Sequence, residues 1–127
     1  MPLIRRSLFP ALAVLAAIGC RSAPTALFDD VLAATSSGGA IRLQSRSVLV
    51  INYFLLARDA SPLIDWAPCA GPGCPAIPAG GTVDVPHAQV PGLTAATTEV
   101  LTYWWHSVAD GRGGFRPDSL RVLIVPL

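Results

Sequence analysis

Two cysteines and two histidines are the side chains of this sequence that could together form a disulfide or bind a metal ion. Cys69 and Cys74 enclose the segment Ala-Gly-Pro-Gly. This segment can turn tightly enough to bring the two Cα atoms within the ~4.4–6.8 Å that a disulfide requires. With His87 and His106, the same cysteines have the ligand types of a zinc site, but their spacing follows no zinc motif. We therefore predict a Cys69–Cys74 disulfide, no metal site and no cofactor.

A hydrolase would need a nucleophile and a base that face each other. Ser107 and His106 have suitable side chains, but successive side chains of a strand point to opposite faces. The chain also has no G-x-S-x-G nucleophile turn. We therefore predict no catalytic residues and a protein that is not an enzyme. The alternative is a small metal-binding protein or hydrolase of the cell envelope that uses His87 and His106.

The run Tyr103-Trp104-Trp105-His106 is the most distinctive short segment. In a strand, Trp104 would face one side and anchor a core, while Tyr103 and Trp105 would share the other side. If uncovered, Tyr103 and Trp105 would form an aromatic surface able to stack on a sugar or an extended peptide. If the segment around Trp66 covers them, no such surface exists. We take Tyr103 and Trp105 as the candidate binding surface.

The first 20 residues have the three parts of an export signal. Arg5 and Arg6 form a basic start, residues 8–18 an apolar core, and residues 17–19 an exit of mostly small residues. The apolar run is about half of the ~20 residues that span a bilayer, which argues against a transmembrane helix. We predict a cleaved signal over residues 1–19.

The segment Leu-Ala-Ala-Ile-Gly-Cys that ends at Cys20 resembles the lipobox of bacterial lipoproteins. It matches at Gly19 and Cys20 and departs at Ala17, where the family prefers leucine, so an ordinary signal peptidase could cut the same bond. An exported protein with three cysteines also leaves one thiol unaccounted for, and a lipid on Cys20 accounts for it. The resemblance therefore implies a membrane anchor on Cys20. The alternative is a secreted protein.

Location and partners follow from the same resemblance. Arg21 is not the aspartate that retains lipoproteins in the inner membrane. This favours the outer membrane or the cell surface, with an envelope protein or a glycan as partner. Removing 19 of the 127 residues leaves 108, with seven arginines, no lysine and eight acidic residues. This balance provides no basic surface for nucleic acid.

Alternating and β-branched residues predict short strands in the mature chain. These are residues 41–44, 47–57, 82–85, 99–108 and 119–127. A long proline-rich segment, residues 58–81 (hereafter the crossing), separates the second strand from the third. Asp110-Gly111 and Gly113-Gly114 indicate a hairpin loop over residues 109–118.

This pattern predicts an all-β fold, a small antiparallel sandwich that resembles immunoglobulin-like domains at the level of fold. No cysteine pair stands at that family's positions, so the resemblance implies no function. We expect a tether and an uncertain first element over residues 20–39, with the sandwich over residues 40–127. Leu27 to Leu32 suits two helical turns or a first strand, and Ser36 to Gly39 suits a flexible break.

Taken together, the residues predict a lipid-anchored envelope protein that acts as a non-enzymatic binding or structural accessory module. A secreted carbohydrate-binding module is a further alternative.

Overall fold

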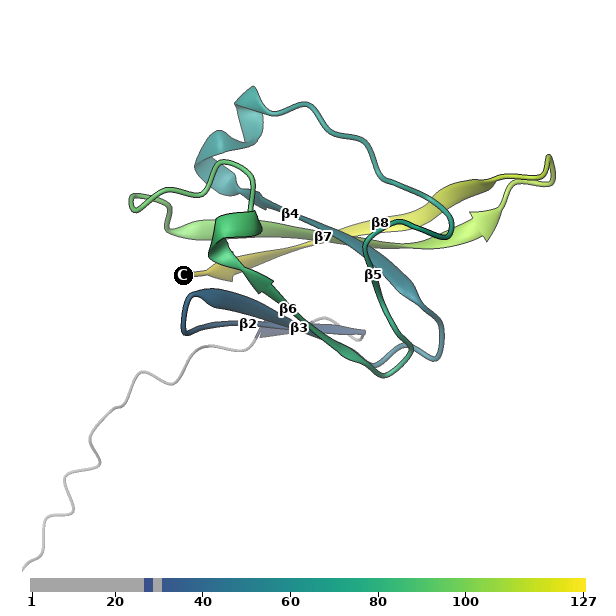
Figure 1. The fold of residues 1–127 in the computed structure, drawn as a ribbon, viewed down its shortest axis with the longest axis horizontal. Coiled ribbons are helices and arrows are strands. Elements are labelled where there is room, and N and C mark those ends of the chain that lie inside the picture. The colour runs from purple at the N-terminus through teal and green to yellow at the C-terminus, as the bar shows by residue number, and fades with distance from the viewer. Residues whose placement is uncertain (1–26, 29–30) are drawn as a thin grey trace, which may run out of the picture.

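The computed structural model describes residues 27–28 and 31–127. Within this part, the chain forms two four-stranded antiparallel sheets that face each other across one hydrophobic core (Figure 1). The predicted all-β sandwich is therefore confirmed. The signal over residues 1–19, Cys20 and residues 21–26 lie outside the described residues.

The first sheet has the order β1-β2-β3-β6. Its strands are β1 (Leu27–Phe28), β2 (Leu32–Ser37), β3 (Ala40–Ser45) and β6 (Thr82–Pro86). The second sheet has the order β5-β4-β7-β8. Its strands are β4 (Ile51–Ala57), β5 (Ala76–Ile77), β7 (Glu99–Ala109) and β8 (Phe115–Pro126). Two 3₁₀ helices, η1 (Arg58–Leu63) and η2 (His87–Gln89), lie in the connections.

The core is built from the inward side chains of both sheets. Along β3, Ile41 and Leu43 are buried, and Arg42 and Gln44 between them are exposed, which confirms the predicted alternation. Trp104 of β7 lies in the core, as expected for one of the two adjacent tryptophans. The buried cluster is Leu32, Ala34, Ile41, Leu43, Ile51, Leu55, Ile77, Val85, Val90, Val100, Trp104 and Val125.

The uncertain first element is a strand. β2 pairs with β3 over its whole length, and Leu32 and Ala34 are fully buried in the core. The helix interpretation of Leu27 to Leu32 is therefore wrong. Gly38 and Gly39 form the turn between β2 and β3, both with positive φ (58° and 80°). That geometry suits a two-residue hairpin, so the expected flexible break is a tight turn.

The predicted strand over residues 47–57 begins four residues late, at Ile51. The apolar residues Val48, Leu49 and Val50 are exposed. They belong to the connection in which the chain leaves the first sheet and enters the second. There the Ser47 hydroxyl oxygen accepts a hydrogen bond from the backbone N–H of Leu49 (3.0 Å). This local turn competes with strand pairing.

The predicted hairpin near Asp110 is present, but its strands are longer than expected. β8 begins at Phe115 rather than near residue 119. Oδ1 of Asp110 accepts hydrogen bonds from the backbone N–H groups of Arg112 (2.7 Å) and Gly114 (3.0 Å) and closes the turn. The pairing of β7 with β8 shifts register between Trp104 and His106, which marks a β-bulge.

Candidate functional site

The aromatic face of β7 is covered by Trp66 of the crossing. The Trp66 ring stacks on Phe54 of β4, with ring centroids 4.5 Å apart and planes 19° apart. It also lies 4.6 Å from the ring of Tyr103 and 6.0 Å from the ring of Trp105. Trp105 is only 1 % exposed, and Tyr103 is half-buried. The prediction that Tyr103 and Trp105 form an open binding surface is therefore wrong, because the Trp66 segment covers this face.

The predicted disulfide is confirmed and holds the crossing in this position. Cys69 and Cys74 are bonded, with their Cα atoms 5.7 Å apart. The indole Nε1 of Trp105 donates a hydrogen bond to the carbonyl oxygen of Cys69 (3.0 Å). The indole is thus fixed at its polar end by the loop that the disulfide closes.

A chain of hydrogen bonds continues this attachment. The backbone N–H of Gly71 donates to the hydroxyl oxygen of Ser107 (2.9 Å). The Ser107 hydroxyl in turn donates to Oδ1 of Asn52 (2.6 Å), and Nδ2 of Asn52 donates to the carbonyl oxygen of Pro75 (3.1 Å). Asn52 is buried, and these two bonds engage both ends of its amide. Ser107 therefore has a structural role, as a link between β4, β7 and the crossing.

The two histidines do not combine with the cysteines or with Ser107. Nδ1 of His106 lies 3.4 Å from the carbonyl oxygen of Val50, and its ring stands edge-on to Trp104. His87 begins η2 and is partly exposed, and its Nε2 atom is buried without a hydrogen-bond partner among the described residues. Residues 27–28 and 31–127 hold no group of three or more His, Cys, Asp or Glu side chains that could bind a metal.

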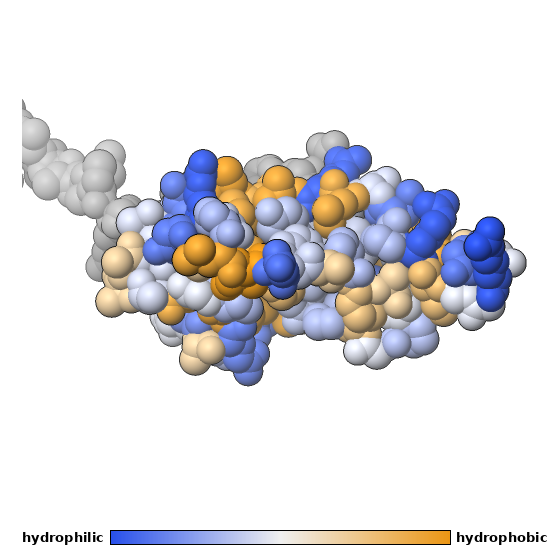
Figure 2. Space-filling view, turned by 90° about the horizontal axis from the view of Figure 1, so that it is seen from above, coloured by the Kyte–Doolittle hydropathy of each residue, from blue (hydrophilic) through white to orange (hydrophobic). Residues whose placement is uncertain are grey.

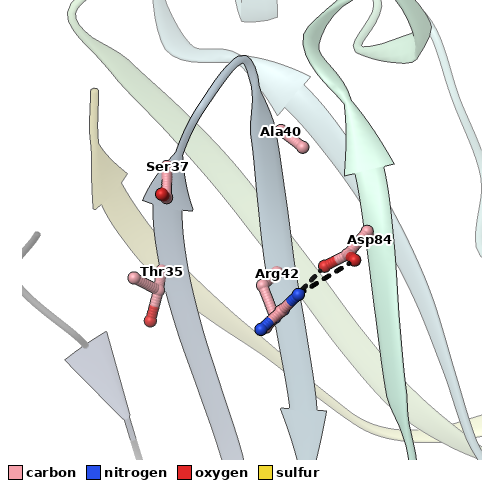
Figure 3. Close-up of a pocket in the computed structure, with 5 residues that line it drawn as sticks. All are labelled: Thr35, Ser37, Ala40, Arg42 and Asp84. Carbon is pink, nitrogen blue, oxygen red and sulfur yellow. Dashed lines mark hydrogen bonds and ion pairs between the residues drawn. The ribbon is translucent and has the colours of Figure 1, made fainter.

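A polar hollow of about 370 Å³ lies on the outer face of the first sheet (Figure 3). Thr35, Ser37 and Ala40 line it together with Arg42 and Asp84, whose side chains point toward each other across β3 and β6. Nε of Arg42 lies 2.9 Å from Oδ1 of Asp84. The hydrogen bond from Arg42 lowers the pKa of the Asp84 carboxyl below its ordinary value. The two charges satisfy each other, which leaves small hydroxyl side chains as the remaining polar groups of the hollow.

A second hollow, of about 310 Å³, lies beside the disulfide loop. Its walls are mostly apolar and include Val50, Pro72 and the half-exposed ring of Phe115. The polar side chains in its lining, Asn52 and Ser107, already bind each other and the backbone.

The outer face of β8 carries an apolar surface that is not among the predicted binding residues. Leu120, Val122 and Ile124 (hereafter the β8 strip) are 49 %, 48 % and 39 % exposed. Val122 pairs with Tyr103 and Ile124 with Leu101, so the strip lies on the same side of the sheet as the covered aromatic residues. Figure 2, which views the molecule from above the second sheet, shows hydrophobic residues at the surface beside polar ones. In the sequence, residues 120–125 are apolar except for Arg121, so both faces of this strand carry apolar side chains.

Within the described part of the chain, no helix is long and apolar enough to cross a membrane. Comparison of the chain with protein-family models, with curated proteins and with solved structures finds no match.

Proposed function

We propose that the protein is an exported, lipid-anchored module of the cell envelope that binds a partner protein and catalyses no reaction. The observation that carries the proposal is the β8 strip, because apolar side chains gathered on one exposed strand are typical of interaction surfaces. Two of the side chains that were considered for catalysis or metal binding, Ser107 and Cys69, have structural partners instead. Ser107 binds Asn52 and Gly71, and Cys69 binds Cys74.

The disulfide supports the location. Disulfides form and persist in oxidising compartments outside the cytoplasm. The lipid on Cys20 remains a proposal from the lipobox-like segment, as does placement in the outer membrane or at the cell surface.

The anchor is tested by the intact mass of the protein extracted from its native membrane. We expect residues 20–127 plus acyl chains, with a gain of two hydrogens on reduction of the Cys69–Cys74 bond. Cys20→Ser is the matched control, and it should release an unlipidated protein. A wild-type mass that begins at Cys20 without acyl chains would make the protein secreted.

The binding role is tested in intact cells with a photo-crosslinking residue in place of Val122. We expect a specific protein adduct at this position. The control position is Gln44, which is exposed on the outer face of the first sheet. Equal labelling at both positions would contradict a binding role for β8. Turnover of any substrate in a broad hydrolase screen, if abolished by a point mutation, would show that the protein is an enzyme.

A further inference from the structure

Three exposed apolar residues follow one another directly in the connection between β3 and β4. Val48, Leu49 and Val50 (hereafter the apolar loop) are 89 %, 61 % and 55 % exposed. In the part of the chain that the structure describes, no other large apolar residues are exposed in an unbroken run. A strand would send alternate side chains to opposite faces, but these residues lie outside the strands, and all three side chains reach the surface.

A second exposed turn lies beside the apolar loop. The backbone N–H of Gly80 donates a hydrogen bond to the carbonyl oxygen of Ser47 (3.0 Å), and the N–H of Ser45 donates to the carbonyl oxygen of Gly81 (2.9 Å). Residues 78–80 of this turn are exposed. The two turns lie at the end of the sandwich where β3 leads into β4 and β5 leads into β6 (Figure 1).

The segments that form these two turns contain no acidic residue. Residues 44–52 include one charged residue, Arg46, and residues 66–83 include none. Arg46 is exposed and stands two positions before the apolar loop. Protein interfaces have a polar rim around their apolar centre. Apolar side chains bordered by a cation, with no carboxylate nearby in the sequence, suit an anionic lipid surface better.

The proposed anchor brings a lipid surface within reach of this end. Cys20 stands seven residues before Leu27, at most roughly 25 Å away along an extended chain. Leu27 lies opposite Ala34, about 7 Å along β2 from Leu32, and Leu32 pairs with Ser45. The apolar loop begins three residues after Ser45. The connection is therefore long enough for Cys20 and the apolar loop to reach the same membrane.

We propose that the apolar loop inserts into the membrane to which the chain is anchored, with the Arg46 guanidinium among the lipid headgroups. This inference rests on the lipid anchor of the proposed function and adds an orientation to it. A single point of attachment does not fix which end of a domain faces the lipid. A second, apolar contact fixes it, and the anchor strengthens that contact by keeping the loop at a high effective concentration near the bilayer.

This orientation leaves the far end of the β8 strip clear of the lipid. Ile124 pairs with Leu101, and Leu101 pairs with Leu56 near the end of β4. Leu56 lies five residues beyond Ile51, the residue that follows the apolar loop, and thus roughly 16 Å along the strand. Interfacial elements bury their apolar side chains only ~5–10 Å deep. The lipid contact and a protein partner at the β8 strip are therefore compatible.

The insertion is tested with a fluorophore on the mature chain held at a vesicle. Cys20→Ser carries an N-terminal hexahistidine that binds a nickel-chelating lipid in vesicles of phosphatidylcholine and phosphatidylglycerol. Leu49→Cys in this background is labelled with an environment-sensitive fluorophore, while Cys69 and Cys74 stay bonded to each other. We expect emission to shift to shorter wavelength at the vesicle. Lipids brominated near the headgroup should quench it.

Leu63→Cys is the matched control for the label. Leu63 is also apolar and is 87 % exposed, but it lies in η1, beyond the opposite end of β4. Its label should keep the emission it has in water. The shift at position 49 should be larger on these vesicles than on phosphatidylcholine alone, and Arg46→Gln should remove that difference.

A further pair of substitutions separates insertion from an effect of the label. Val48→Asp/Val50→Asp should abolish the shift at position 49, because carboxylates are costly to place in the lipid. Both residues are exposed, so the melting temperature should remain nearly unchanged.

The proposal is overturned if the label at position 49 keeps its aqueous emission on vesicles that hold the protein, or if the label at position 63 shifts as much. A shift at position 49 that requires an added envelope protein would also overturn it and would make the loop a protein-binding surface. These readings are independent of native acylation, because the hexahistidine replaces the anchor. A native mass without acyl chains would instead contradict the anchor itself and, with it, the membrane at which the loop inserts.

Discussion

The indole of Trp105 and the backbone of Cys69 are joined by a hydrogen bond of 3.0 Å, although 36 residues separate them in the sequence. The bond connects the most buried outer residue of β7 to the loop closed by the disulfide. As a result, the crossing covers the aromatic face of the second sheet, while the β8 strip on the same side stays exposed.

Removal of the disulfide should loosen this cover. We expect Cys69→Ser/Cys74→Ser to lower the free energy of unfolding by roughly 2 kcal/mol, because closing so short a loop removes limited entropy from the unfolded chain. Denaturation in urea measures the change. Cys20→Ser, which leaves the loop intact, should have no effect on unfolding. An equally stable double variant would show that the hydrogen bonds of Asn52 and Ser107 hold the crossing without the disulfide.

Truncation of Trp66 should expose the aromatic face. We expect Trp66→Ala to cost about 2 kcal/mol or more, less than a fully buried tryptophan because Trp66 is half-buried. Tryptophan emission should shift to longer wavelength as water reaches Trp105. Leu63→Ala, at an exposed site, should change stability by no more than about 0.5 kcal/mol. An unchanged emission maximum would mean that another segment covers Trp105.

Gly92 holds the loop after η2 against η1, and its substitution should be more damaging than its backbone angle alone implies. A Cβ atom at Gly92 would lie 2.3 Å from the Cβ atom of Ala60. Gly111 is the matched control, because its φ of 78° is close to the 74° of Gly92 and a Cβ there meets nothing within 4 Å. Gly111→Ala should cost about 1–2 kcal/mol, the cost of the left-handed conformation. Thermal melting should show a clearly larger loss for Gly92→Ala, and equal losses would contradict the clash.

The Arg42–Asp84 pair should make a small contribution to stability that depends on pH. Arg42 holds the pKa of Asp84 below its ordinary value of 3.8, so the folded state favours the charged carboxylate. The contribution is therefore complete above the ordinary pKa and is lost as the pH falls through the lowered one. Asp84→Asn should melt slightly below wild type at neutral pH, since exposed ion pairs contribute little. The two melting temperatures should become equal in acid. A difference that persists in acid would contradict the ion pair as its cause.

Much of this fold could be predicted from residues that lie close together in the sequence. Alternation of Ile41 and Leu43 with polar neighbours, the β-branched run that contains Ile51, and the glycines after Asp110 each depend on nearby residues only. The same holds for the disulfide, because Cys69 and Cys74 are five residues apart. These features were predicted correctly, since strand alternation and tight turns are properties of short segments.

Strand ends were predicted less well. Val48, Leu49 and Val50 continue an apolar pattern, yet they lie in the connection between sheets, where no strand of the described residues pairs with them. Conversely, the β7–β8 ladder extends to Phe115, beyond the apolar residues of β8. Pairing with a partner strand decides where a strand ends, and that partner is distant in the sequence.

Side-chain alternation is enough to predict that Trp104 and Trp105 face opposite sides of one strand. Which of the two sides is covered depends on contacts with distant parts of the chain. Trp66 lies 39 residues before Trp105, and its contact with Phe54 and Tyr103 depends on the path of the whole crossing. Alternation assigns residues to the two faces of a strand. Whether a face is buried depends on contacts with residues far away in the sequence, so alternation could not predict that Trp105 is buried and Val122 is exposed.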